Sequence, residues 1–419
     1  MAQVLRRMWA VWLLVAMVAA CKPWPHSFDN IPDQQARPPA HQSGYPYNPN
    51  QPQNGQLLPQ PGPYDQPPSK TVKVGLLVPL SGRSESMGKA LRDASILALF
   101  DKYAVLSGSQ ASIRVELVPK DTKGTPSGAR QAAAEAVQEG AQLLVGPLFS
   151  QSVEAIKPLA KTGKISIITF SNNAEIAGDG VFTIGFNPDE QARRIANYVF
   201  SRDINRMAVL APNTPYGRQV MKAVDGVAEL LGRKTQPSIR YSPSGGSLKD
   251  DVKRLAVEGS VGARVGFEAL FLPEGGDKLG MVLKRLSEHN ITPRNVQFVG
   301  TGLWDDRDMI RLYDLQGAWL ASSPPQMYEA FEQRFINTYN YKPPRIASLA
   351  YDAVALAATL ATNDEGFHRS VFTNPNGYSG PANGIFRFRK NGMVERGLAV
   401  MEVGNGGFKV IDPAPTSFQ

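Results

Sequence analysis

Three short motifs carry residue types that enzymes use for acyl transfer through a serine ester. Ser86 stands three residues before Lys89, Lys161 opens a Lys-Thr-Gly triplet, and Ser171-Asn172-Asn173 matches a Ser-x-Asn pattern. In enzymes that combine these motifs, a lysine activates the serine and the other two motifs complete one site. Here Lys-Thr-Gly precedes Ser-x-Asn, and it falls in the turn after an expected helix rather than on a core strand. The order therefore predicts no common site, and we expect a protein that is not an enzyme.

Metal and phosphate chemistry are also disfavoured. Asp305, Asp306 and Asp308 form an acidic cluster, but no ordered series of oxygen ligands follows it, so we interpret it as a turn and a helix start that favour carboxylates. The chain has a single cysteine and four histidines, none paired at a helical metal-ligand spacing. The segment 82–89 has five residues between its glycines, where a phosphate-binding loop needs four. We expect no cofactor and no metal.

Composition narrows the class of partner. The 419 residues are 42% hydrophobic and 20% charged, which is typical of a globular protein with a buried core. The net charge of +8 comes from dispersed basic residues and not from dense runs. Such a distribution suits an anionic membrane or polymer surface and argues against nucleic acid.

The first seventy residues contain no globular pattern. Arg6 and Arg7 precede an apolar run that ends in Val-Ala-Ala-Cys, so we predict a signal peptide over 1–20 and lipidation of Cys21, as in the bacterial lipoprotein box. The alternative is an ordinary signal peptide with an incidental cysteine. Residues 21–70 are rich in Pro, Gln and Asn, which predicts a disordered tether. These features place the protein in the cell envelope, lipid-anchored and periplasmic or associated with the outer membrane.

From residue 71 onward, apolar stretches alternate with helical patterns. Expected strands lie at 72–79, 113–118, 142–145, 165–170, 207–210, 269–272, 296–299, 384–389 and 397–403. Expected helices lie at 88–103, 127–138, 152–161, 189–201, 217–231, 278–288, 328–339 and 347–361. Strands that are apolar on both faces and alternate with helices indicate parallel sheets covered on both sides.

The pattern restarts after residue 187, which predicts two doubly wound α/β lobes and not one oversized sheet. We expect one domain over 71–419. Lobe one covers about 71–187 and 323–385, and lobe two covers about 188–322 and 386–410, joined by crossing hinge segments.

Ligands of such sheets bind at the carboxyl ends of the strands. The loops expected there are rich in hydroxyls, amides, glycines and a few carboxylates, and free N–H groups at helix starts favour an anion. We therefore predict a cleft between the lobes for a small polar or zwitterionic ligand. Its candidate residues are Ser81, Ser150, Ser171, Asn172, Tyr216 and Glu274.

A family resemblance runs through most of the chain. VKVGLLVPLSG, LLVGPLFSQS and MAVLAPNTPYGRQV resemble, in order, the leucine-binding branch of type I periplasmic binding proteins. FVGTGLWDD, LQGAWLASSP and PPRIASLAYDAVALAATL are similar to penicillin-binding protein activators, lipoproteins that carry the same fold. The resemblance implies that Ser150 holds a ligand carboxylate and that Tyr216 faces the ligand from lobe two. The Ser-x-Ala-Thr pattern of amino-acid binders is replaced by Ser171-Asn172-Asn173-Ala174, so amino-acid recognition departs from the family.

Two functions follow from this resemblance. The first is activation of a peptidoglycan synthase, a penicillin-binding protein, by protein contact. The alternative is an amino-acid receptor of an ATP-driven uptake system. A hydrolase remains a third class because of the serine motifs.

Overall fold

The computed structural model describes residues 70–106, 113–306, 308–404 and 406–418. The predicted signal peptide, Cys21 and the tether up to residue 69 lie outside these ranges. Within them, no helix combines the length and the apolar character that a membrane span requires.

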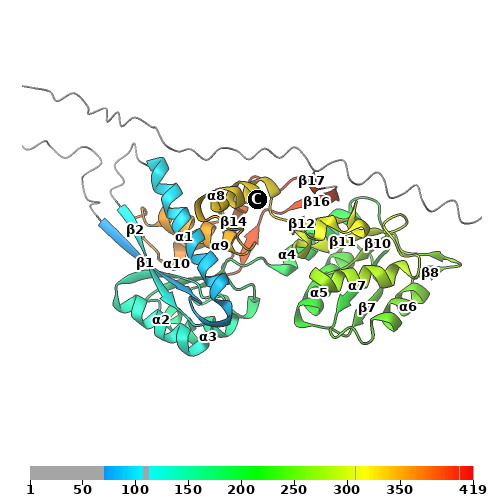
Figure 1. Cartoon of the computed structure of the whole chain (residues 1–419), viewed down its shortest axis with the longest axis horizontal. Coiled ribbons are helices and arrows are strands. Elements are labelled where there is room, and N and C mark those ends of the chain that lie inside the picture. Colours follow the sequence, from blue (N-terminus) through cyan, green and yellow to red (C-terminus); the bar gives the residue numbers. More distant parts are fainter. Residues whose placement is uncertain (1–69, 107–112, 307, 405, 419) are drawn as a thin grey trace, which may run out of the picture. The chain divides into compact units, whose positions relative to one another are not determined.

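A five-stranded parallel sheet has the order β2-β1-β3-β4-β5. Its strands are β1 (Lys70–Val78), β2 (Ile113–Asp121), β3 (Ala141–Val145), β4 (Ser166–Thr169) and β5 (Val181–Thr183). One face is covered by α1 (Glu85–Leu106) and α9 (Ala347–Leu360), the other by α2 (Pro126–Gln138) and α3 (Ser150–Lys161) (Figure 1). Leu76 and Leu77 are both fully buried and join the cores on opposite faces, as expected for a sheet covered on both sides.

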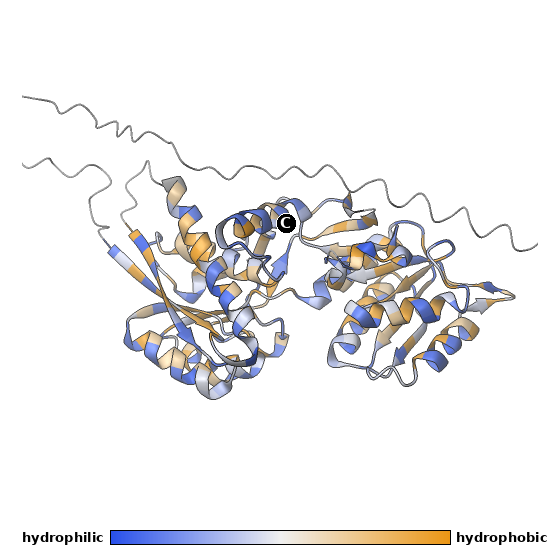
Figure 2. Ribbon diagram, viewed as in Figure 1, coloured by the Kyte–Doolittle hydropathy of each residue, from blue (hydrophilic) through white to orange (hydrophobic). Residues whose placement is uncertain are grey.

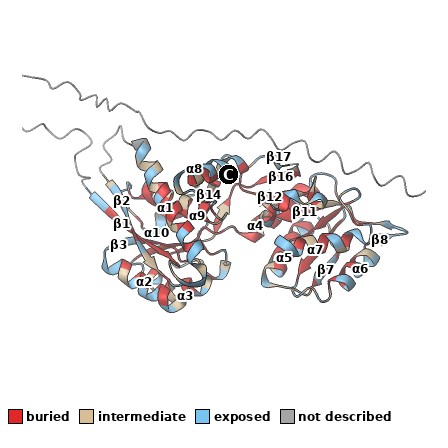
Figure 3. Ribbon diagram, viewed as in Figure 1, coloured by how far each residue is buried: buried red, intermediate tan, exposed pale blue. Residues whose placement is uncertain are grey.

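A seven-stranded mixed sheet has the order β17-β16-β12-β11-β10-β6-β7. Its strands are β6 (Met207–Pro212), β7 (Thr235–Tyr241), β10 (Ala269–Phe271), β11 (Gln297–Thr301), β12 (Trp319–Ser322), β16 (Ala399–Gly404) and β17 (Gly407–Asp412). One face carries α4 (Pro188–Phe200) and α5 (Pro215–Leu230), the other α6 (Leu248–Glu258) and α7 (Gly276–Ser287). Apolar residues concentrate on the strands and inner helix faces of both sheets (Figure 2), where most residues are buried (Figure 3). This architecture confirms the predicted pair of doubly wound α/β lobes.

The remaining elements complete the two lobes. The first core is completed by α8 (Pro325–Tyr339), α10 (Arg369–Phe372), β13 (Tyr378–Gly380), β14 (Gly384–Phe388) and β15 (Val394–Arg396). A ribbon is formed by β8 (Ser260–Val261) and β9 (Arg264–Val265). Short 3-10 turns are η1 (Gly82–Ser84), η2 (Ala174–Ile176), η3 (Gly302–Trp304), η4 (Met309–Arg311) and η5 (Tyr313–Leu315).

The chain passes between the two lobes at 184–187, 323–324 and 397–398. The third passage lies later than the expected boundary near residue 386. Phe386, Phe388 and Val394 are at most 2% exposed and pack in the core of the five-stranded sheet. The chain joins the second sheet only at β16, so residues 386–396 belong with lobe one and not with lobe two.

Close helix–strand packing positions the loops at the strand ends. A Cβ atom on Gly88 would lie 1.8 Å from the carbonyl oxygen of Pro79, and one on Gly217 would lie 1.9 Å from that of Pro212. Only a glycine allows α1 and α5 to begin directly against the ends of β1 and β6. The residues at these helix starts are therefore held at the carboxyl edges of the sheets, where the sequence predicted the site.

Candidate functional site

Ser81 links two neighbouring loops of lobe one. Its hydroxyl donates to Asp121 Oδ2 at 2.6 Å, while Asp121 Oδ1 accepts the N–H of Leu80 at 2.8 Å. Partial burial opposes ionisation of Asp121, but the hydrogen bonds from Ser81 and from backbone N–H groups outweigh it and hold the pKa of Asp121 below its ordinary value. Ser81 thus fixes the loops after β1 and β2.

The other predicted residues of lobe one follow β3 and β4. Ser150 is the first residue of α3 and is half-buried. Ser171 is 7% exposed, and its Oγ accepts the N–H of Asn173 at 3.2 Å, whereas Asn172 is exposed. The strand order brings the loops after β1, β3 and β4 to one edge of the sheet. Ser171 thus stabilises its own loop, and no described hydrogen bond uses the side-chain amide of Asn172.

The predicted residues of lobe two lie in one polar cluster. The hydroxyls of Tyr216 and Thr301 are 2.8 Å apart, and Tyr241 donates to Glu274 Oε2 at 2.6 Å. Burial, together with the nearby Glu274 carboxylate, raises the pKa of Tyr216 to about 12, although the bond with Thr301 lowers it. Tyr216 therefore stays a neutral hydroxyl that can donate or accept.

Sequence reasoning missed three members of this cluster. Thr301 ends β11, Tyr241 ends β7, and the indole of Trp304 donates to the carbonyl of Glu274 at 2.8 Å. Thr301 and Trp304 stand in the FVGTGLWDD segment that carries part of the resemblance, but neither was predicted as a site residue. Tyr241 had no signal because its strand was not predicted.

No described hydrogen bond or cavity joins Ser150 or Ser171 to Tyr216. The structure brings the lobe-one residues to one sheet edge and the lobe-two residues to another. The single ligand cleft that would unite them stays a prediction.

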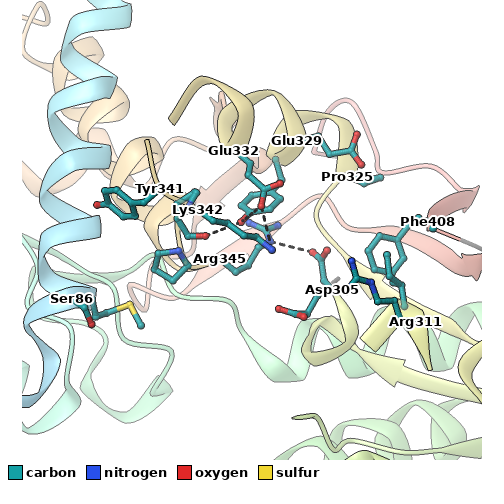
Figure 4. A pocket seen from close by; sticks show the side chains of 18 residues that line it. Ser86, Asp305, Arg311, Pro325, Glu329, Glu332, Tyr341, Lys342, Arg345 and Phe408 are labelled. Carbon is teal, nitrogen blue, oxygen red and sulfur yellow. Dashed lines mark hydrogen bonds and ion pairs between the residues drawn. The ribbon is translucent and has the colours of Figure 1, made fainter. Parts of the chain in front are cut away.

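A cavity of about 650 Å³ lies where segments of both lobes meet. Figure 4 shows the side chain of Arg345, which lies between α8 and α9, directed toward Asp305 in the segment after β11. Arg345 Nε donates to Asp305 Oδ2 at 3.2 Å, and Ser322 Oγ donates to the same oxygen at 2.7 Å. Asp305 thus connects a lobe-two loop to a lobe-one segment and to the end of β12, next to the second passage of the chain.

The Arg345 side chain has further partners besides Asp305. Its guanidinium lies over the Tyr328 ring at 4.0 Å and the Phe186 ring at 4.8 Å. Its Nη1 donates to Asn383 Oδ1 at 2.6 Å, and Asn383 in turn donates to Asp352 at 2.7 Å. No motif predicted this group, because its members are scattered along the sequence.

A second buried cation lies at the passages. Arg396 is 6% exposed and donates through Nη2 to the carbonyl of Ile184 at 2.6 Å. Burial lowers its pKa to about 10 against the opposing effects of Asp352 and Glu190. Burial raises the pKa of Glu190 to about 8, although Arg389 and Arg396 oppose the rise. Arg396 and Glu190, which lie at the passages, therefore have pKa values that depend on how deeply they are buried.

The acyl-transfer motifs lie on separate elements. Ser86 is in the first turn of α1 and lines the cavity of about 650 Å³, and Lys89 Nζ lies 5.7 Å from the centre of the Tyr341 ring. Lys161 ends α3, on the other face of the sheet, and Ser171 follows β4. No nucleophile, base and orienting group come together among these residues.

The acidic cluster also has local partners. Asp306 Oδ1 accepts the N–H of Asp308 at 2.8 Å, and Asp308 pairs with Arg311 at 3.9 Å. Across the part of the chain that the structure describes, no group of three or more potential metal ligands forms.

Two α/β lobes with polar loops at their strand ends and several connecting passages define a binding protein of the periplasmic type. The chain belongs to the Periplasmic binding protein family, whose model matches residues 71–407. The resemblance found in the sequence is confirmed at this level.

The chain is similar in sequence to penicillin-binding protein activators and similar in fold to a solute-binding protein. The chain is 29% identical over 152 residues to the penicillin-binding protein activator LpoA of Photobacterium profundum, which covers 36% of this chain and 23% of that protein. It is 28% identical over 185 residues to the penicillin-binding protein activator LpoA of Aliivibrio fischeri, and the match covers 43% of this chain and 29% of that protein. The chain thus spans less than a third of these relatives' length. An ABC transporter substrate-binding protein from Sphaerobacter thermophilus has the same fold, with a TM-score of 0.65, 17% identity and coverage of 83% and 99%.

Proposed function

We propose that this protein is a non-enzymatic, lipid-anchored envelope protein that activates a peptidoglycan synthase of the penicillin-binding class by protein contact. The observation that carries the proposal is the partial match to two penicillin-binding protein activators. The anchor is Cys21, and residues 21–70 hold the domain near the membrane.

Activation by protein contact requires that the activator bind two states of the synthase with different affinities. An activator without chemistry of its own acts by binding one state of its partner more tightly than another. Two lobes joined by several passages can offer different surfaces in open and closed arrangements. The separation of Ser86 from Lys161 and Ser171 supports a role without acyl transfer.

The test is reconstitution with the cognate synthase. The soluble chain from Thr71 onward should raise glycan polymerisation or crosslinking when supplied in excess, because the anchor acts only through local concentration. Ser86→Ala and Lys161→Ala should stimulate as well as the unaltered protein. Loss of stimulation in a folded Ser86→Ala variant would point to catalysis, and absence of any stimulation would contradict the activator function.

A receptor for a small polar ligand is the second candidate. The hydroxyls of Tyr216, Thr301 and Tyr241 and the carboxylate of Glu274 at the strand ends of lobe two favour it. Because Asn173-Ala174 replaces the Ala-Thr of amino-acid binders, we expect weak or no binding of leucine in calorimetry. Micromolar or tighter binding would favour the uptake receptor.

A further inference from the structure

A second cavity, of about 430 Å³, lies at the carboxyl edge of the five-stranded sheet. It is formed by the loops after β1, β2 and β3, where α2 and α3 begin side by side (Figure 1). Its lining includes Arg83, Ser84, Lys123, Ser150 and Ser152. None of the residues after β4, including Ser171 and Asn172, lines it.

The first turn of α3 has backbone N–H groups that no described acceptor uses. Phe149 occupies its N-cap position and supplies no side-chain hydrogen bond, and its carbonyl accepts only the N–H groups of Ser152 and Val153. No described hydrogen bond uses the N–H groups of Ser150 and Gln151. An uncapped helix start of this kind presents its N–H groups and the positive end of its dipole to an anion.

Ser152 supplies an independent sign of a ligand. It is 1% exposed, and its Oγ has no hydrogen-bond partner among the described residues. A buried hydroxyl without a partner costs free energy, so such atoms are rare unless a ligand or water completes them. Ser152 is one of the residues that line the cavity.

The charge of the cavity is positive. Arg83 and Lys123 are both exposed, and no described ion pair engages either side chain. Asp121, at the end of β2, accepts hydrogen bonds from Ser81, Leu80 and the Lys123 backbone and does not line the cavity. The lining therefore includes two cations and a helix start, and none of the lining residues is acidic.

We propose that this cavity binds a phosphate group. The donors comprise two N–H groups, the hydroxyls of Ser84 and Ser152, a guanidinium and an ammonium. That number exceeds what the two oxygens of a carboxylate accept and suits a phosphate, with its additional oxygens and its charge of about −1.5 to −2. The site stands whether or not the chain activates a synthase.

Isothermal titration of the full chain at constant ionic strength tests the site. Inorganic phosphate probes the free ion, glycerol phosphate probes a phosphate carried on a larger molecule, and succinate probes carboxylate. Saturable phosphate binding should weaken roughly 3- to 10-fold in Arg83→Gln and in Lys123→Gln. The matched control is Lys161→Gln, which removes the same charge at the far end of α3 and should change the affinity less than about 2-fold.

Ser152→Ala separates a ligand role from a structural one. Because the Ser152 hydroxyl has no partner in the described structure, its removal should leave the melting temperature of the free protein unchanged or higher, while phosphate affinity falls. A lower melting temperature with unchanged affinity would overturn the assignment. So would tighter binding of succinate than of phosphate, absence of saturable binding at millimolar phosphate, or equal losses in Lys161→Gln and Lys123→Gln. Stimulation of a synthase is measured separately and does not depend on these results.

Discussion

Buried polar atoms without hydrogen-bond partners gather near the passages between the lobes. In the described structure they include Asp189 Oδ1, Glu190 Oε1, Ser323 Oγ, Arg345 Nη2 and both Nε and Nη1 of Arg396. Each such atom costs free energy in a fixed structure. Their concentration at one place is consistent with a region whose packing changes when the lobes move.

Because of the buried carboxyl group of Glu190, the stability of the folded protein should depend on pH. Its folded pKa of about 8 lies above the ordinary value of 4.5 because of burial. The folded protein therefore holds a proton that the unfolded chain releases, so stability falls as pH rises from about 4.5 to 8. Glu190→Gln removes this loss and should be more stable than the unaltered protein at pH 8.5 by on the order of 1–3 kcal/mol, with little difference at pH 4.5, measured by denaturant unfolding.

Glu395→Gln is the control, and its effect has the opposite sign. Partial burial opposes ionisation of Glu395, but hydrogen bonds from Arg387 and Arg389 lower its pKa. Its stabilisation is present above the unfolded pKa and is lost as pH falls through the folded value. Glu395→Gln should therefore be less stable at neutral pH and approach the unaltered protein in acid. A parallel pH profile for Glu190→Gln and the unaltered protein would contradict the assignment to Glu190.

At the scale of elements, α5 depends on its contact with the end of β6. An alanine at Gly217 would place Cβ 1.9 Å from the Pro212 carbonyl, so the helix start must move. We expect Gly217→Ala to destabilise the protein by about 1–3 kcal/mol. Gly226→Ala in the same helix meets nothing closer than 3.8 Å and should be neutral or stabilising by up to about 1 kcal/mol. Thermal unfolding of both variants measures these changes in stability. Equal changes would show that helix propensity, and not the close approach to the Pro212 carbonyl, determines the effect of alanine at position 217.

The predictability of elements follows from their burial. Strand β6 is continuously apolar and β1 is continuously buried from Val74 to Val78, and the sequence predicted both. By contrast, β7 alternates buried and exposed residues, contains Pro237 and lies at the sheet edge, so it lacked that signal. The Arg345–Asp305 pair could not be predicted, because only the passages of the chain bring these residues together.

At the scale of the whole molecule, Arg345 and Asp305 connect a segment of lobe one to a loop of lobe two. Their side chains are 20% and 9% exposed, so the pair is largely shielded from solvent. Removing one partner leaves the other enclosed without compensation, which is costly, whereas removing both costs less. The pair should therefore show strong coupling in stability and should restrict motion between the lobes.

A double-mutant cycle of Arg345→Gln and Asp305→Asn measures that coupling. We expect an interaction of about 1–3 kcal/mol in denaturant unfolding. The comparison pair is Arg285 and Glu288, which is 41% and 40% exposed and should show less than about 0.5 kcal/mol. Hydrogen exchange at 184–187, 323–324 and 397–398 should rise in Arg345→Gln, because the link that joins the two lobes there is lost. Coupling no larger than that of the exposed pair, or exchange unchanged at all three passages, would mean that Arg345 packs only within its own lobe.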